Sequence, residues 1–302
     1  MEPNQKPGFL KCVWLMVYPL LVYEAVSIAV SGLASSLLMI IHHKEISAVG
    51  NYAESVSLLM EYLYKNYVYI AAVTGLLTLP LLLLFMKKDR QREQEAGIYV
   101  RYSAVSPVLY LLPFFAGAFG SLFVNHFLMF SGLMELLYGT YEETAELLFQ
   151  GQLWIELLVE GMLIPVVEEC IFRGLIYRRL RWISGPKAAL WISALFFGLF
   201  HGNLLQAIYA GILGVLFALL YERFQSLWAA ILAHAGGNLL SLAVSEVEEL
   251  QWFYETDARM LLLTGAVMLL FVLCIYLIYS LVNPQPISDK AAAELPQDRI
   301  QV

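Results

Sequence analysis

Long runs of apolar residues that contain almost no charge recur along the whole chain. They cover residues 13–41, 68–86, 103–130, 153–177, 188–201, 204–221, 227–245 and 260–282. A helix that crosses the hydrocarbon core of a bilayer needs about 20 such residues, at a rise of about 1.5 Å each. The pattern therefore predicts an all-α, polytopic membrane bundle of about eight transmembrane helices. The fifth run is short, and Gly202 after it fits either a tight turn or a kink, so seven spans are the alternative.

The overall composition supports a membrane protein and excludes other classes. Apolar residues make up 60% of the 302 positions and charged residues only 14%, whereas a soluble domain has roughly 45–50% and about 25%. Lys and Arg total 18 against 25 Asp and Glu, a net charge of −7. A chain without basic excess has no general attraction to phosphate backbones. These values argue against a water-soluble globule, a disordered chain and a nucleic-acid binder, and make membrane lipid an expected partner.

Basic residues are distributed unevenly between the loops that join these runs. With eight spans, both termini and the loops around 87–101 and 178–187 fall on one side, which receives most of the Lys and Arg residues. The other side receives only Lys44, Lys65 and Arg259. Because cytoplasmic loops carry the excess of Lys and Arg, we expect an integral multi-pass protein with both termini in the cytoplasm. In a bacterium its location would be the plasma membrane.

The spacing of the runs divides the chain into three parts. Residues 1–150 form an N-terminal transmembrane region with three spans, and residues 151–245 form a core with four. Residues 246–302 hold the last span and a cytoplasmic tail. The tail, 284–302, is polar and contains several prolines, a composition typical of disorder.

Ionisable side chains inside apolar helices are the strongest functional signal in this sequence. Glu24 in the first run and His126 in the third stand alone, whereas three other runs carry groups that could act together. These are Glu168, Glu169 and Arg173 in the fourth, His201 at the end of the fifth, and His234 and Asn238 in the seventh. A charged side chain within the bilayer is energetically costly and usually marks a functional site. Together these groups could satisfy one another in a single polar pocket, and we expect them to share one.

Helical geometry assigns different surroundings to the two neighbouring glutamates. Glu168 and Glu169 point about 100° apart, whereas Glu169 and Arg173 are four residues apart on one face and can form an ion pair. Glu168 is then the freer carboxylate. His234 and Asn238 are also four residues apart and face the same side of their helix.

The three segments together resemble a known family. EECIFRG at 168–174, FGLFH at 197–201 and HAGGN at 234–238 match, in order, EExxxR, FxxxH and HxxxN. These are the motifs of the CAAX-protease and bacteriocin-processing (CPBP, or Abi) intramembrane proteases, which include the Ras-converting CAAX endopeptidase II. The resemblance covers residues of about 155–245, and it implies a conical polar active-site cavity within the helical bundle.

The resemblance also implies roles for the motif residues. Glu168 would act as general base with His201 as its partner on the attacking water, and His234 and Asn238 would stabilise the oxyanion. The remaining two, Glu169 and Arg173, would hold the helix and tune the base. The implied substrate is a membrane-associated peptide or a lipidated protein.

The metal content stays open at the level of sequence. Glu168, His201 and His234 could supply three zinc ligands with an open fourth position, as in a metalloprotease. A water activated by glutamate and histidine explains the same residues without a metal, and the HExxH arrangement of many zinc proteases is absent.

Three functions compete for these residues. An intramembrane endopeptidase that acts on CAAX-type or bacteriocin- or pheromone-type substrates is the first. A non-catalytic bacteriocin self-immunity protein or scaffold of the same fold is the second. A transporter with a Glu and His proton relay is the third, and the clustering of the polar residues within 165–238 argues against it.

Overall fold

The protein is almost entirely helical. The computed structural model describes residues 8–137 and 152–287. The first half forms α1 (Phe9–Ile41), α2 (His43–Ala48), α3 (Tyr52–Lys65), α4 (Tyr67–Glu95), the 3₁₀ turn η1 (Pro107–Tyr110), α5 (Leu111–Phe130) and α6 (Leu133–Leu137). The second half forms α8 (Leu153–Leu158), η3 (Val159–Leu163), α9 (Ile164–Glu169), η4 (Cys170–Tyr177), α10 (Arg178–Ser184), α11 (Pro186–Leu199), α12 (Leu204–Phe224), α13 (Leu227–Glu246), α14 (Glu248–Gln251), η5 (Trp252–Tyr254) and α15 (Asp257–Leu281).

The predicted all-α polytopic membrane bundle is confirmed, whereas the count of eight spans is not. Six described segments are long and apolar enough to cross a membrane: α1, α4, η1 with α5, α12, α13 and α15. The fifth predicted span, α11, has only 14 residues, about 21 Å at helical rise. The fourth predicted span is an uninterrupted helical segment, 153–184, whose spacing changes between α-helical and π-helical along its length.

The break after α11 is a tight turn. Gly202 has a φ of 76°, a left-handed conformation that glycine adopts without steric cost. The turn is closed by Asn203, whose side chain accepts a hydrogen bond from the backbone N–H of Gln206 at 2.8 Å and so caps the start of α12. Two separate helices, α11 and α12, therefore pack against each other and place His201 between them.

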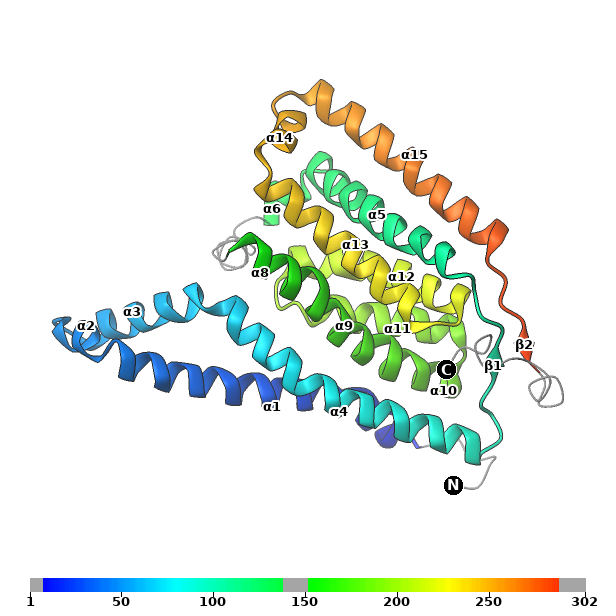
Figure 1. Ribbon diagram of the computed structural model, residues 1–302, viewed down its shortest axis with the longest axis horizontal. Helices are drawn as coiled ribbons and strands as arrows, with labels where there is room; N and C mark the ends of the chain where they lie inside the picture. Colours follow the sequence, from blue (N-terminus) through cyan, green and yellow to red (C-terminus); the bar gives the residue numbers. More distant parts are fainter. Residues whose placement is uncertain (1–7, 138–151, 288–302) are drawn as a thin grey trace.

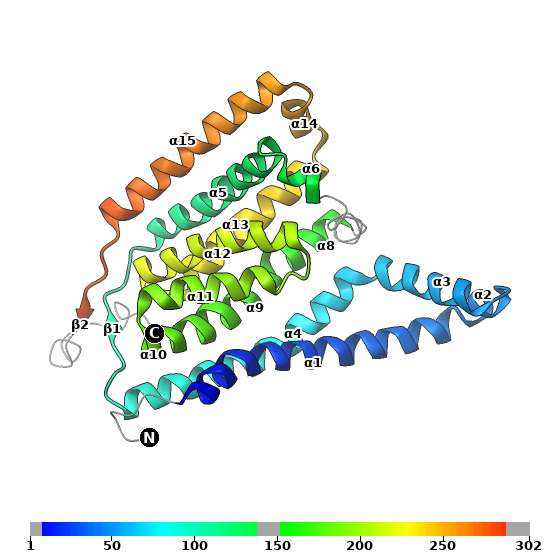
Figure 2. The ribbon, with the colours of Figure 1, turned by 180° about the vertical axis from the view of Figure 1, so that it is seen from behind.

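The centre of the bundle is the helix that carries the acidic motif. Every residue of η4 is buried, and α1, α4, α11, α12 and α13 all pack against it. Helices α5 and α13 lie side by side in both ribbon views (Figures 1 and 2), and α15 covers the far side of α5. The outermost helices, α1 and α15, expose long apolar faces, as expected for helices that contact lipid.

Two arginines of α10 connect the helices at one end of the bundle. Arg178 pairs with Glu93, and Arg179 donates to Asp89 at 2.6 Å and to the backbone carbonyl of Leu15. These contacts join α10 to α4 and to the start of α1. The strands β1 (Arg101–Tyr102) and β2 (Pro286–Ile287) pair antiparallel and bring the other end of the described chain to the same region (Figure 1).

Both described ends of the chain thus lie at the basic end of the bundle, as the predicted topology requires. That this end faces the cytoplasm stays a prediction, and so does the three-part division of the chain. Of the tail expected to be disordered, 284–302, all but 284–287 falls outside the described residues.

Candidate functional site

A fully buried ion pair forms the base of the site. The Nη1 group of Arg173 donates to Glu169 Oε1 at 2.7 Å, and both side chains have no exposed surface. Nη2 donates to the backbone carbonyl of Gly214 at 2.8 Å. The guanidinium carbon lies 4.6 Å from the ring centre of Phe197 and 5.4 Å from that of Phe217, distances typical of cation–π contact. The ion pair predicted from the spacing is confirmed, and it ties the helix of the acidic motif to α11 and α12.

His234 on α13 contacts both glutamates. Its Nδ1 lies 3.0 Å from Glu169 Oε1, and its Nε2 lies 3.7 Å from Glu168 Oε2. The ring stacks on Phe217, with centres 4.9 Å apart and planes at 20°. Because Nδ1 faces a carboxylate oxygen that already binds an arginine, Nδ1 is assigned as a donor and Nε2 is directed at Glu168. The imidazole is therefore fixed in orientation by its neighbours.

Glu168 has a different environment from its neighbour in sequence. Its side chain is 14% exposed, against 0% for Glu169, so it is the carboxylate that water or a substrate can reach. Tyr23 of α1 and Tyr67 of α4 lie within electrostatic range of Glu168 and of Glu160. The sequence motifs did not indicate Tyr23, Tyr67 or Glu160. The two tyrosines come from N-terminal helices outside the motifs, and tyrosines are common in apolar runs.

Asn238 contacts the backbone of the helix that carries the glutamates. The helix widens to π-helical spacing in η3, where the N–H of Ile164 donates to Val159, five residues back. At the same spacing the carbonyl of Glu160 would need the N–H of residue 165, which is a proline and has none. The Nδ2 group of Asn238 donates to that carbonyl at 2.8 Å. The amide therefore satisfies a buried backbone acceptor that Pro165 leaves without a partner.

His201 lies at the edge of the site, directly after α11. Its Nδ1 donates to the backbone carbonyl of Phe197 at 2.8 Å, which leaves Nε2 as an acceptor in the neutral ring. The ring packs edge-on against Phe197 with centres 5.0 Å apart, and His234 packs against the same ring at 5.5 Å. Within the described residues His201 makes no hydrogen bond or ion pair with Glu168.

The six predicted residues therefore gather in one region, although not in every predicted pairing. Glu168, Glu169, Arg173 and His234 form one connected cluster, and Asn238 contacts the backbone of the same helix. His201 is linked to the cluster through an aromatic ring. This arrangement places a reachable carboxylate next to an imidazole of fixed orientation, and a second imidazole packs against the same aromatic ring as the first. A carboxylate beside imidazoles is the combination that acid–base catalysis uses.

The donor set does not fit a metal ion in this arrangement. Among residues 8–137 and 152–287, no group of three His, Cys, Asp or Glu side chains is placed to bind one. Glu168 and His234 are neighbours, but His201 does not complete a three-ligand set with them. The zinc site that the sequence left open is therefore not formed by the described side chains.

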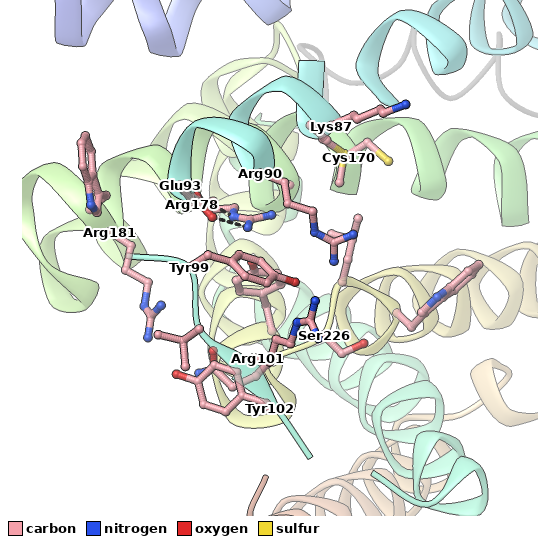
Figure 3. A pocket seen from close by; sticks show the side chains of 18 of the residues that line it. Lys87, Arg90, Glu93, Tyr99, Arg101, Tyr102, Cys170, Arg178, Arg181 and Ser226 are labelled. Atoms are coloured by element: carbon pink, nitrogen blue, oxygen red, sulfur yellow. Dashed lines mark hydrogen bonds and ion pairs between the residues drawn. The ribbon is translucent and has the colours of Figure 1, made fainter. Parts of the chain in front are cut away.

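A cavity of about 1320 Å³ lies on another face of the same helix (Figure 3). Cys170 and Val166 contribute to its wall, whereas none of the six predicted site residues lines it. A conical cavity directly above those six residues stays a prediction.

Comparisons with known proteins agree with the motifs. The family described as type II CAAX prenyl endopeptidase Rce1-like matches residues 150–240. The protein named "Putative membrane peptidase YdiL" of Bacillus subtilis (strain 168) is 29% identical over 114 residues, which are 37% of this chain and 46% of that protein. The aligned region thus spans less than half of that relative's length. No solved structure matches. The resemblance to the CAAX-protease and bacteriocin-processing family is confirmed, and it lies in the part of the chain that holds the site.

Proposed function

We propose that this protein is an intramembrane endopeptidase that hydrolyses peptide bonds of membrane-associated peptides or lipidated proteins, of CAAX type or of bacteriocin or pheromone type. The single observation that carries the proposal is the position of His234, which contacts the carboxylates of both Glu168 and Glu169. Three motifs from different helices meet there, and the Rce1-like match covers the same residues. An integral multi-pass protein and a membrane-associated substrate would both be held at the same bilayer.

Glu168 is the proposed general base. Glu169 is fully buried, and its Oε1 already contacts both Arg173 and His234, so water does not reach this carboxylate as it can reach Glu168. Glu168 is partly exposed and has one ionic neighbour, His234. In the proposed reaction Glu168 takes a proton from water as the water oxygen bonds to the substrate's carbonyl carbon. It then returns that proton to the amide nitrogen as the carbon–nitrogen bond breaks, so that a carboxylic acid and an amine form, and the acid's proton passes on to give a carboxylate and an ammonium group.

The two histidines have different proposed roles, one toward the attacking water and one toward the oxyanion. Nε2 of His201 is an acceptor and can orient the attacking water together with the base. Nε2 of His234 is directed at Glu168 and can donate to the oxyanion when it carries a proton, with Asn238 as the second donor. Asn238 already uses one N–H on the carbonyl of Glu160. Its second amide hydrogen is the one that this role requires.

Each of these steps uses the protein's own groups. The resemblance allows a zinc enzyme, in which a metal would polarise the substrate carbonyl, but no step is assigned to zinc because the described donors do not form its site.

The proposal is tested by replacing Glu168 with glutamine. The purified protein in nanodiscs is given a prenylated CAAX peptide and an unprenylated peptide library in ¹⁸O-water, and products are identified by mass spectrometry. Wild type is expected to place one ¹⁸O atom in each new carboxylate, and Glu168→Gln to abolish cleavage with an unchanged melting temperature. Glu24→Gln is the matched control, because Glu24 is also a carboxylate within an apolar helix but is exposed on α1.

Other outcomes favour the competing functions. Wild-type turnover by Glu168→Gln would remove that residue as the base. No cleavage of any substrate by wild type, with a biological effect that Glu168→Gln retains, would favour a non-catalytic immunity or scaffold protein. Proton-coupled flux in liposomes would favour a transporter.

A further inference from the structure

The large cavity lies at the basic end of the bundle, away from the proposed active site. Its wall is formed by the end of α4, the chain around β1, helix α10 and the turn between α12 and α13 (Figure 3). The first two segments are consecutive in the chain, whereas α10 and the turn between α12 and α13 come from its second half, and the ion pair between Arg178 and Glu93 joins α10 to α4. Its volume of about 1320 Å³ exceeds the roughly 300–1,000 Å³ of typical small-molecule sites.

The mouth of this cavity carries an excess of positive charge. Five cationic side chains and one carboxylate line it: Lys87, Arg90, Arg101, Arg178, Arg181 and Glu93. Two of the arginines are neutralised, Arg178 by Glu93 and Arg181 by Glu222. The other three cations have no carboxylate partner among the described residues. Figure 3 shows Arg90 and Arg101 extending into the same opening, where Arg90 also lies over the ring of Tyr99.

The floor of the cavity is apolar. Leu79, Leu83 and Met86 of α4 face Val166, Cys170 and Ile231 across it. The first three of these residues belong to α4 and Ile231 belongs to α13, and both helices are long and apolar enough to cross a membrane. This part of the floor therefore extends from the basic end toward the hydrocarbon region. Gly174 allows Met86 to come close, because a Cβ atom there would lie 2.9 Å from its sulfur. The cavity thus changes from cationic to apolar along its depth.

Two tryptophans mark the level of the mouth. Trp182 is 48% exposed and Trp228 is 62% exposed, and both line the cavity. Exposed tryptophans of membrane proteins concentrate at the level of the lipid headgroups. We therefore expect Lys87, Arg90 and Arg101, which line the same cavity, to lie near the phosphate groups of the bilayer.

We propose that this cavity binds one anionic phospholipid, with its phosphate at Lys87, Arg90 and Arg101 and an acyl chain along the apolar floor. Three cations that have no carboxylate partner within the described part of the chain favour an anion in a half-enclosed site, and an apolar floor at membrane depth favours an anion that carries a hydrocarbon chain. The binding is independent of the proposed proteolysis, because the wall residues Val166 and Cys170 lie on a different face of the helix from the catalytic cluster.

The test measures binding to the purified, delipidated full-length protein in a neutral detergent. Dioctanoyl phosphatidylglycerol, dioctanoyl phosphatidylcholine and glycerol phosphate are titrated separately, and apparent dissociation constants are taken from the shift in melting temperature. Two double variants are compared with wild type. Lys87→Gln with Arg90→Gln removes two lining cations, whereas Lys88→Gln with Arg92→Gln removes two exposed cations of the same helix end that do not line the cavity.

Phosphatidylglycerol is expected to stabilise wild type saturably, and the other two probes are not. Each cation near an anionic lipid contributes roughly a fivefold factor, so the lining variant should bind about 30-fold more weakly. The matched control should stay within about twofold of wild type. Equal losses in both double variants would show diffuse attraction and overturn the proposal. Equal binding of phosphatidylcholine, or of glycerol phosphate, would also overturn it, because the ligand would then be a neutral lipid or a soluble phosphate.

Discussion

The closest approach between helices α5 and α13 depends on a glycine, and its substitution is expected to disturb the site at a distance. A Cβ atom at Gly117 would lie 1.7 Å from the carbonyl oxygen of Ala233. Contacts shorter than 3.0 Å are essentially never seen, so Gly117→Ala requires the two backbones to separate by about 1.3 Å. The neighbour is backbone, which moves only with its helix. His234 follows Ala233 directly, so the imidazole should be displaced from its present position relative to Glu168 and Glu169.

The expected losses of stability and of cleavage rate are large for the addition of a single methyl group. Overpacking of a core costs about 1–3 kcal/mol, and a misplacement of about 1 Å in a catalytic group can cost roughly 100-fold in rate. We therefore expect Gly117→Ala to lower the melting temperature and to reduce cleavage about 100-fold. Peptide cleavage in nanodiscs and thermal unfolding of the same preparation measure both effects.

The matched control is Gly265→Ala in α15, where a Cβ would meet nothing within 4 Å. Alanine is favoured over glycine in a helix by about 1 kcal/mol, so this variant should retain full activity and be as stable as wild type or more so. If Gly117→Ala behaved like this control, the tight contact would not set the position of His234 and the reasoning would be wrong.

Three further predictions concern the site. Arg173→Ala leaves the carboxylate of Glu169 buried without its cation and should destabilise the protein by about 3–5 kcal/mol; equal denaturant midpoints for this variant and wild type would contradict the pairing. Asn238→Ala removes the donor to the Glu160 carbonyl and should cost about 1–3 kcal/mol, with a loss of cleavage in addition, which calorimetry and the peptide assay separate. Chelator treatment should leave cleavage unchanged, and elemental analysis of the active protein should find no stoichiometric zinc; loss of activity that zinc restores would reverse this expectation.

The sequence predicted those contacts of the site that are local. Glu169 and Arg173 are four residues apart on one helix, and their ion pair follows from that spacing alone. The irregularity caused by Pro165 was also predictable, because a proline removes one helical donor wherever it stands. Its consequence was not, since the carbonyl that lost its donor, at Glu160, finds a partner on α13, 78 residues away in sequence.

The pairing of His234 with both glutamates could not be read from the motifs. It depends on the rotation and depth of α13, which are set by its contact with α5, a helix outside all three motifs. The same reasoning explains why Tyr23 and Tyr67 were missed. Their position near Glu168 follows from the packing of α1 and α4 onto the central helix, and nothing in their local sequence distinguishes them from other tyrosines.

The amino-acid sequence alone determined that this chain lies in a membrane, that it is helical, and which few polar groups its apolar helices carry. Those properties follow from transfer free energies and from helical periodicity, which act residue by residue. The tertiary structure decided which of the polar groups touch, which carboxylate stays reachable, and that a cationic cavity opens beside the central helix. These features depend on how closely helix backbones approach, and that distance is set jointly by side chains from segments far apart in the chain.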